Sequence, residues 1–156
     1  MKKEIERKYL LGYLPTGMKI LKSQVIHQTY LAIGEEEIRV RKVITSGKTS
    51  FFITMKCGIG LVREEYEKEI TEKTYEQLLM SSQKTPLVKY RYMIESCGFH
   101  CEIDIYVNSH HLDLKVVEIE FDSEEEAKAF VKPEWLSTEL TGDKCYKNQI
   151  LWKEIQ

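Results

Sequence analysis

The sequence predicts an α+β fold that is mainly β: a closed eight-stranded antiparallel barrel with a charged lumen and helices packed outside. Eight segments alternate apolar and polar residues with a period of two, as β-strands do, and helical patterns are few and short. On seven of those segments the polar positions are repeatedly ionisable. A solvated sheet face normally mixes in Ser, Thr, Asn and Gln, so this repetition indicates an enclosed charged surface.

Composition limits the class of protein. A chain of 156 residues, 42% hydrophobic and 31% charged, is typical of one folded domain with a core. The net charge of −2 gives no general attraction to nucleic acid or to membrane surfaces, so we expect neither as a partner. The four cysteines form no CxxC pair, and no apolar run is long enough for a signal or a membrane span. We therefore expect a cytoplasmic protein with reduced thiols.

The strands follow one another along most of the chain. We expect them at residues 2–11, 23–33, 36–45, 49–57, 61–71, 87–96, 99–107 and 114–122. Ser46-Gly47-Lys48 and Cys97-Gly98 favour hairpin turns, and a Gly-Ile-Gly segment at 58–60 separates the fourth and fifth strands. A longer hairpin loop is expected from Asn108 to Asp113.

Three segments have helical patterns. The first covers residues 71–82 and ends before Pro86. Ser123 begins a capping box with the acidic residues that follow it, which predicts the second helix. A last helix is expected from about Asp143, and residues 133–136 suit a short turn.

The ionisable residues recur at two-residue spacing, so those of one strand share one face. The acids of this face are Glu4, Glu6, Glu65, Glu67, Glu102, Asp104, Glu118 and Glu120. The bases are Lys8, Arg39, Arg41, Lys56, Lys89 and Arg91. The alternate positions are mainly Ile, Val, Tyr, Phe, Met and Cys, which would pack on the outside of the closed sheet.

Enclosed charges need compensation, because removing an ion from water costs several kcal/mol. Arginine and lysine suit phosphate oxygens, and paired carboxylates suit Mg²⁺ or Mn²⁺, which take oxygen ligands. Acids and bases together therefore predict a site for a metal and a polyphosphate.

The opening segment, EIERK, resembles the ExExK signature of the CYTH, or triphosphate tunnel metalloenzyme, superfamily. The similarity continues along nearly the whole chain in RVR (39–41), TMK (54–56), REEYE (63–67), KYR (89–91), EID (102–104), EIE (118–120) and ELTGDKCYKN (139–148). The resemblance implies a single CYTH domain over residues 1–156 and an eight-stranded antiparallel tunnel.

The same resemblance implies roles for the charged residues. Substrate binding would fall to Lys8, Arg39, Arg41, Lys56, Lys89 and Arg91, with Lys144 or Lys147 added from a C-terminal helix. One or two divalent ions, Mg²⁺ or Mn²⁺, would be held by Glu4, Glu6, Asp104, Glu118 and Glu120. The catalytic group would comprise Glu65, Glu67, Asp104 and Lys8, with Glu65 or Glu67 contributing to the metal or placing the attacking water.

The activity that this resemblance implies is metal-dependent hydrolysis of a triphosphate. The compact chain shows no insertion that would read a nucleobase, which favours inorganic tripolyphosphate as substrate. A class IV adenylyl cyclase, a thiamine triphosphatase and a non-catalytic polyphosphate or nucleotide sensor remain alternatives, because the motifs are shared. A homodimer also remains open.

Overall fold

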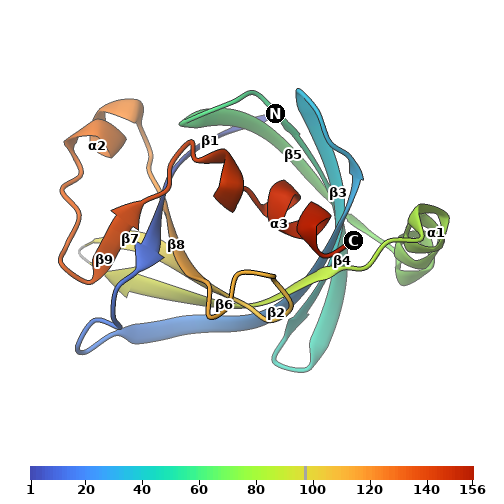
Figure 1. Cartoon of the computed structure of the whole chain (residues 1–156), viewed down its shortest axis with the longest axis horizontal. Helices are drawn as coiled ribbons and strands as arrows, with labels where there is room; N and C mark the ends of the chain where they lie inside the picture. The colour runs from blue at the N-terminus through green and yellow to red at the C-terminus, as the bar shows by residue number, and fades with distance from the viewer. Residues whose placement is uncertain (97) are drawn as a thin grey trace.

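The computed structural model describes residues 1–96 and 98–156, and it is mainly β (Figure 1). Cys97, the first residue of the expected Cys97-Gly98 turn, lies outside the described residues. The strands are β1 (Lys2–Leu11), β2 (Lys19–Ala32), β3 (Glu36–Thr45), β4 (Lys48–Cys57), β5 (Val62–Ile70), β6 (Leu87–Ser96), β7 (Phe99–Tyr106), β8 (Lys115–Glu120) and β9 (Leu136–Glu139). The helices are α1 (Glu72–Ser82), α2 (Glu124–Ala129), the 3₁₀ helix η1 (Lys144–Tyr146) and α3 (Asn148–Glu154).

Eight antiparallel strands close into the predicted barrel. The sheet order is β5-β4-β3-β2-β6-β7-β8-β1-β9, and an additional pairing of β5 with β1 closes the ring. The first half of β1 pairs with β5, and its second half pairs with β8 on the other edge. The predicted strand bounds hold to within two residues, except that β2 begins four residues earlier than expected.

The short strand β9 was not predicted. It pairs with the end of β1, where Leu11 lies opposite Leu136, and so covers the edge that β5 leaves unpaired. Only one of its four residues is buried, so the segment carries no alternating pattern that sequence could reveal.

Two helices pack outside the barrel, as expected. Tyr75 of α1 stacks on Phe51 of β4 with ring centroids 5.0 Å apart and contacts the small cluster around Val40. Ala127 of α2 belongs to a larger outer cluster with Ile5, Tyr9 and Trp135. The apolar outer face predicted for β1 is therefore confirmed.

The prediction that all helices pack outside is wrong for α3. Leu151 and Trp152 of α3 pack against Tyr30, Leu87, Tyr106 and Val116. Tyr30 lies opposite Arg39 across the β2–β3 pair, and cross-strand partners share a face, so these residues point into the lumen. Helix α3 therefore fills one end of the barrel, and Figure 1 shows it within the ring of strands.

Arg7 fastens the α2–β9 segment to the outside of β1. Its guanidinium donates to both carboxylate oxygens of Glu139, at 2.7 and 2.8 Å, and to the carbonyls of Ala127 and Phe130, at 2.8 and 3.2 Å. Charge-assisted bonds of this kind contribute more than neutral ones. One side chain thus joins α2, the residue that follows α2, and β9 to strand β1.

We predict that Arg7→Met lowers the free energy of unfolding by about 2–3 kcal/mol, because four hydrogen bonds are lost, two of them partly buried. Chemical denaturation measures the change. The matched control is Lys128→Met, since the Lys128–Glu124 pair is 3.9 Å apart and exposed and should contribute below about 0.5 kcal/mol. Equal effects of the two substitutions would show that Arg7 is not such a fastening.

Candidate active site in the barrel lumen

The barrel encloses a cavity of about 480 Å³ that residues of all eight barrel strands line, together with residues 140–144 and 146–148. Thirteen of the fourteen charged positions predicted for the inner face line it, and Asp104 is the exception. Lys144 and Lys147 line it as well, from η1 and the residue after it. The period-two pattern therefore predicted correctly which face of each strand points into the barrel.

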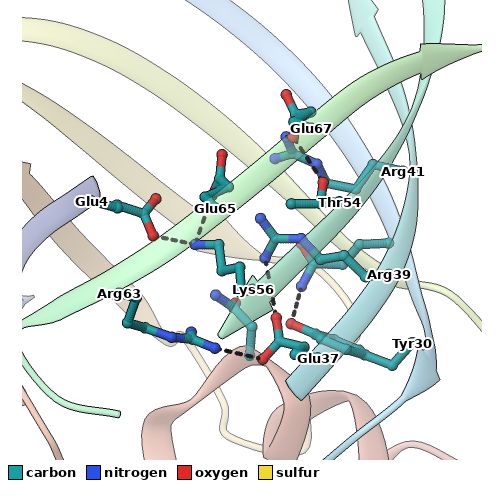
Figure 2. A network of polar contacts seen from close by, with 12 residues as sticks. Glu4, Tyr30, Glu37, Arg39, Arg41, Thr54, Lys56, Arg63, Glu65 and Glu67 are labelled. Carbon is teal, nitrogen blue, oxygen red and sulfur yellow. Dashed lines mark hydrogen bonds and ion pairs between the residues drawn. The ribbon is translucent and has the colours of Figure 1, made fainter. Parts of the chain in front are cut away.

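The two arginines of β3 are each held by neighbouring side chains (Figure 2). Arg41 pairs with Glu67 at 2.5 Å, and Thr54 donates to the same carboxylate at 2.7 Å. Arg39 contacts the Tyr30 hydroxyl and lies 3.9 Å from Glu37. Burial alone would lower the pKa of Arg39, but Tyr30 and Glu37 raise it above the ordinary value, so the guanidinium stays charged.

Lys56 of β4 lies between two carboxylates. Its ammonium is 2.6 Å from Glu4 on β1 and 3.1 Å from Glu65 on β5, as Figure 2 shows. Burial raises the pKa of Glu65, but Lys56 more than offsets it, so the pKa lies below the ordinary value. Glu65 is therefore ionised at neutral pH, and its register opposite Lys56 settles which residues of β5 face inward.

Asp104 lies beneath the cavity wall and is fully buried. Its carboxylate accepts from Lys89 at 2.6 Å and from Arg91 at 2.7 Å through each oxygen. Burial would raise the pKa of Asp104, but Arg91 and Lys89 hold it well below the ordinary range. The structure thus places Asp104 where it fixes two predicted phosphate-binding bases. Its expected roles in metal binding and catalysis stay predictions.

Carboxylates gather where β1 and β8 pair. Glu6 lies opposite Glu120, and Glu118 lies opposite Lys8. Burial and the nearby charge of Glu118 raise the pKa of Glu6 to about 8. Burial also disfavours ionised Glu118, but Lys8 and Arg91 outweigh this and lower its pKa to about 2. One carboxylate of this cluster is therefore ionised, and its neighbour is held protonated near neutral pH.

The donor set suits a hard divalent cation, although it is not assembled as a cage. Among residues 1–96 and 98–156, no three Asp, Glu, His or Cys side chains are grouped so that they could hold a metal ion. Several of the carboxylates form ion pairs with lysines instead, such as Glu120 with Lys2 at 3.0 Å. A carboxylate forced to remain protonated, as Glu6 is, marks a place where an added cation would be favourable.

The C-terminal segment reaches the cavity through Lys8. The Lys8 ammonium donates to the Tyr146 carbonyl at 2.7 Å, and it lies 3.7 Å from Glu118. The backbone of Lys8 accepts from Leu140 N at 2.7 Å and donates to the Thr141 hydroxyl at 2.9 Å. A predicted substrate-binding residue is thus also an attachment point for the segment that leads into α3.

Tyr30, Glu37 and Arg63 are among the cavity residues that were not assigned a role from sequence. Glu37 and Arg63 each lie two residues before a predicted site residue, so the alternation itself extends to them. That spacing could have found both. Tyr30 carries no comparable signal, because aromatic residues are common on both faces of strands.

Comparisons with known proteins agree with this geometry. No family model matches the chain. The chain is 36% identical over 149 residues to an inorganic triphosphatase of Nitrosomonas europaea, covering 95% of each chain. It is 31% identical over 156 residues to an inorganic triphosphatase of Acetivibrio thermocellus, covering 98% of this chain and 95% of the relative.

The chain belongs to the inorganic triphosphatase family. The crystal structure of an inorganic triphosphatase superposes with a TM-score of 0.65 at 32% identity, over 97% of this chain and 95% of that one. Membership in this family confirms the resemblance to the CYTH superfamily and the closed-barrel fold. No helix in the described part of the chain is long and apolar enough to cross a membrane.

The raised pKa of Glu6 predicts how the stability of this family member depends on pH. Between pH 4.5, the ordinary pKa of this group, and about pH 8, the Glu6 carboxyl is protonated in the folded protein and ionised in the unfolded protein. The free energy of unfolding of the metal-free protein should therefore fall as pH rises, by up to about 1.4 kcal/mol per unit from this group.

Glu6→Gln should remove that dependence, so the metal-free variant is more stable than wild type at pH 8 and no more stable near pH 4. Denaturant unfolding with a chelator present measures this. Glu120→Gln is the control, because its carboxylate is half exposed and should change the slope little. Parallel pH profiles of wild type and Glu6→Gln would contradict the buried-carboxyl interpretation.

Proposed function

We propose that the protein hydrolyses inorganic tripolyphosphate in the barrel cavity with the help of Mg²⁺ or Mn²⁺. The observation that carries this proposal is the composition of the cavity wall: paired arginines and lysines on β3, β4 and β6 face clustered carboxylates on β1 and β8. The names of the two curated relatives support the choice of substrate. All 156 residues would form one CYTH domain, since the last helix fills the end of the barrel that the strands build.

The bases bind and orient the phosphate chain. Arg39, Arg41 and Arg91 offer planar donor forks that match phosphate oxygens, while Lys8, Lys56 and Lys89 supply compact charges. Because Asp104 fixes Lys89 and Arg91, their positions are set before the substrate arrives. Such preorganisation is most of what phosphoryl transfer requires of a protein.

The acids divide into two groups. Glu4, Glu6, Glu118 and Glu120 would hold the divalent ion, which supplies charge to the phosphate oxygens when bound. Glu65 and Glu67 would accept hydrogen bonds from the attacking water and orient it, since Glu65 stays ionised beside Lys56. Attack of water at a terminal phosphorus forms a new P–O bond and breaks the P–O–P bridge, and orthophosphate and pyrophosphate are released.

We expect purified protein to release phosphate from tripolyphosphate with Mg²⁺ or Mn²⁺ and to stop when a chelator is added. Glu118→Gln should lower kcat at least a hundredfold, because it removes a proposed metal ligand that is ionised at neutral pH. Phosphate release measured over a range of metal concentrations tests this, and circular dichroism checks the fold. Full activity of Glu118→Gln would overturn the metal assignment, and cyclic AMP as the sole product from ATP would favour a cyclase.

Arg39→Ala should mainly weaken substrate binding, because its guanidinium faces the cavity from the wall opposite the carboxylate cluster. We expect KM for tripolyphosphate to rise about tenfold or more, as loss of a charge-assisted pair does. Steady-state kinetics at saturating metal measures it. An unchanged KM would exclude Arg39 from phosphate binding.

A further inference from the structure

Arg63 of β5 lines the cavity and is more accessible than the bases predicted to bind phosphate. Its side chain is 23% exposed, whereas the six predicted phosphate-binding bases are between 1% and 14% exposed. It lies opposite Glu4 across the β1–β5 pair. An incoming anion could therefore reach Arg63 more easily than it could reach the other bases.

The pairing of Arg63 is weak compared with that of its neighbours. Its Nη2 atom is 3.5 Å from Glu37, and Nη1 of Arg39 is 3.9 Å from the same carboxylate. Figure 2 shows the two guanidinium groups approaching Glu37 from different sides. Arg91, by contrast, makes 2.7 Å bonds to Asp104. Glu37 is therefore shared by two guanidinium groups and holds neither of them at a short distance.

The loop before β5 fixes the orientation of this side chain. The Nε atom of Arg63 donates to the Gly58 carbonyl at 3.2 Å. Gly58 has a φ of +95°, a conformation that favours glycine. Nε is thus engaged by the loop and Nη2 by Glu37 at 3.5 Å, whereas Nη1 has no hydrogen-bond partner among the described residues.

We propose that Arg63 is a further substrate-binding residue, whose terminal nitrogens take phosphate oxygens between Glu4 and Arg39. Glu37 holds the guanidinium loosely in place and yields it to the anion. This assignment rests on the proposed function, because it names another contact of the same triphosphate.

The test is calorimetric titration of tripolyphosphate into metal-free protein with a chelator present. Arg63→Met should bind about tenfold more weakly than wild type, since one charge-assisted contact is lost. Arg63→Lys keeps the charge but not the fork and should bind with an intermediate affinity. Glu37→Gln should bind at least as tightly as wild type, because it removes a competing carboxylate.

The control is Lys68→Met, which removes one positive charge from the exposed outer face of the same strand and should leave the affinity unchanged. Wild-type affinity in Arg63→Met would overturn the inference. So would equal weakening in Arg63→Met and Glu37→Gln, which would mean that the pair only supports the fold. If Arg63→Met does not fold, Arg63→Lys with wild-type affinity overturns it instead.

The inference and the proposed function fail in different ways. Wild-type protein that neither binds nor hydrolyses tripolyphosphate would overturn the proposed function. Wild-type binding and hydrolysis that Arg63→Met leaves unchanged would overturn only the role of Arg63.

Discussion

Charge compensation inside a closed barrel is the constraint on which the rest of this structure depends. Ions removed from water cost several kcal/mol each, so the cavity is stable only if cations and carboxylates are interleaved. Antiparallel pairing achieves this, because residues opposite each other share a face and come within reach. Lys56 between Glu4 and Glu65, and Asp104 between Lys89 and Arg91, are two results of that arrangement. Each unit joins two or three strands, so the same pairs that neutralise the cavity also hold the barrel closed.

Strand β1 both closes the ring of strands and supplies residues to the candidate site. This strand pairs with β5 and then β9 along one edge and with β8 along the other. Its inner face carries the carboxylates Glu4 and Glu6, and its backbone at Lys8 binds the segment leading to α3. A change in the C-terminal segment would therefore shift Lys8, a predicted substrate-binding residue. The segment that leads into α3 and the candidate site are thus joined by direct hydrogen bonds.

Alternation with a period of two is a local property, so strands and their inward faces could be predicted from sequence. The position of a residue along the barrel axis depends on the whole fold, so local sequence does not reveal it. Asp104 faces inward as predicted. Val116, which lies opposite it on β8, and Tyr106 nevertheless pack against α3, at the end of the lumen that this helix fills. A last helix was expected from sequence, but the apolar residues that receive it lie on four strands, β2, β6, β7 and β8, which only the closed fold brings around it. Strand β9 was too short to show any alternation.

The ion pairs of the cavity also explain why one set of residues suits both a metal and an anion. Lys56 partly neutralises both Glu4 and Glu65. On the proposed function, a cation bound by the carboxylates would take over that role, and the ammonium would become available to phosphate. Metal and substrate would then favour each other's binding, because each would satisfy the charges that the other releases. Glu37 differs, since Arg39 and Arg63 share its one carboxylate at 3.9 and 3.5 Å. Guanidinium groups held at these distances can turn to an anion without first losing a short ion pair, as the proposed role of Arg63 requires.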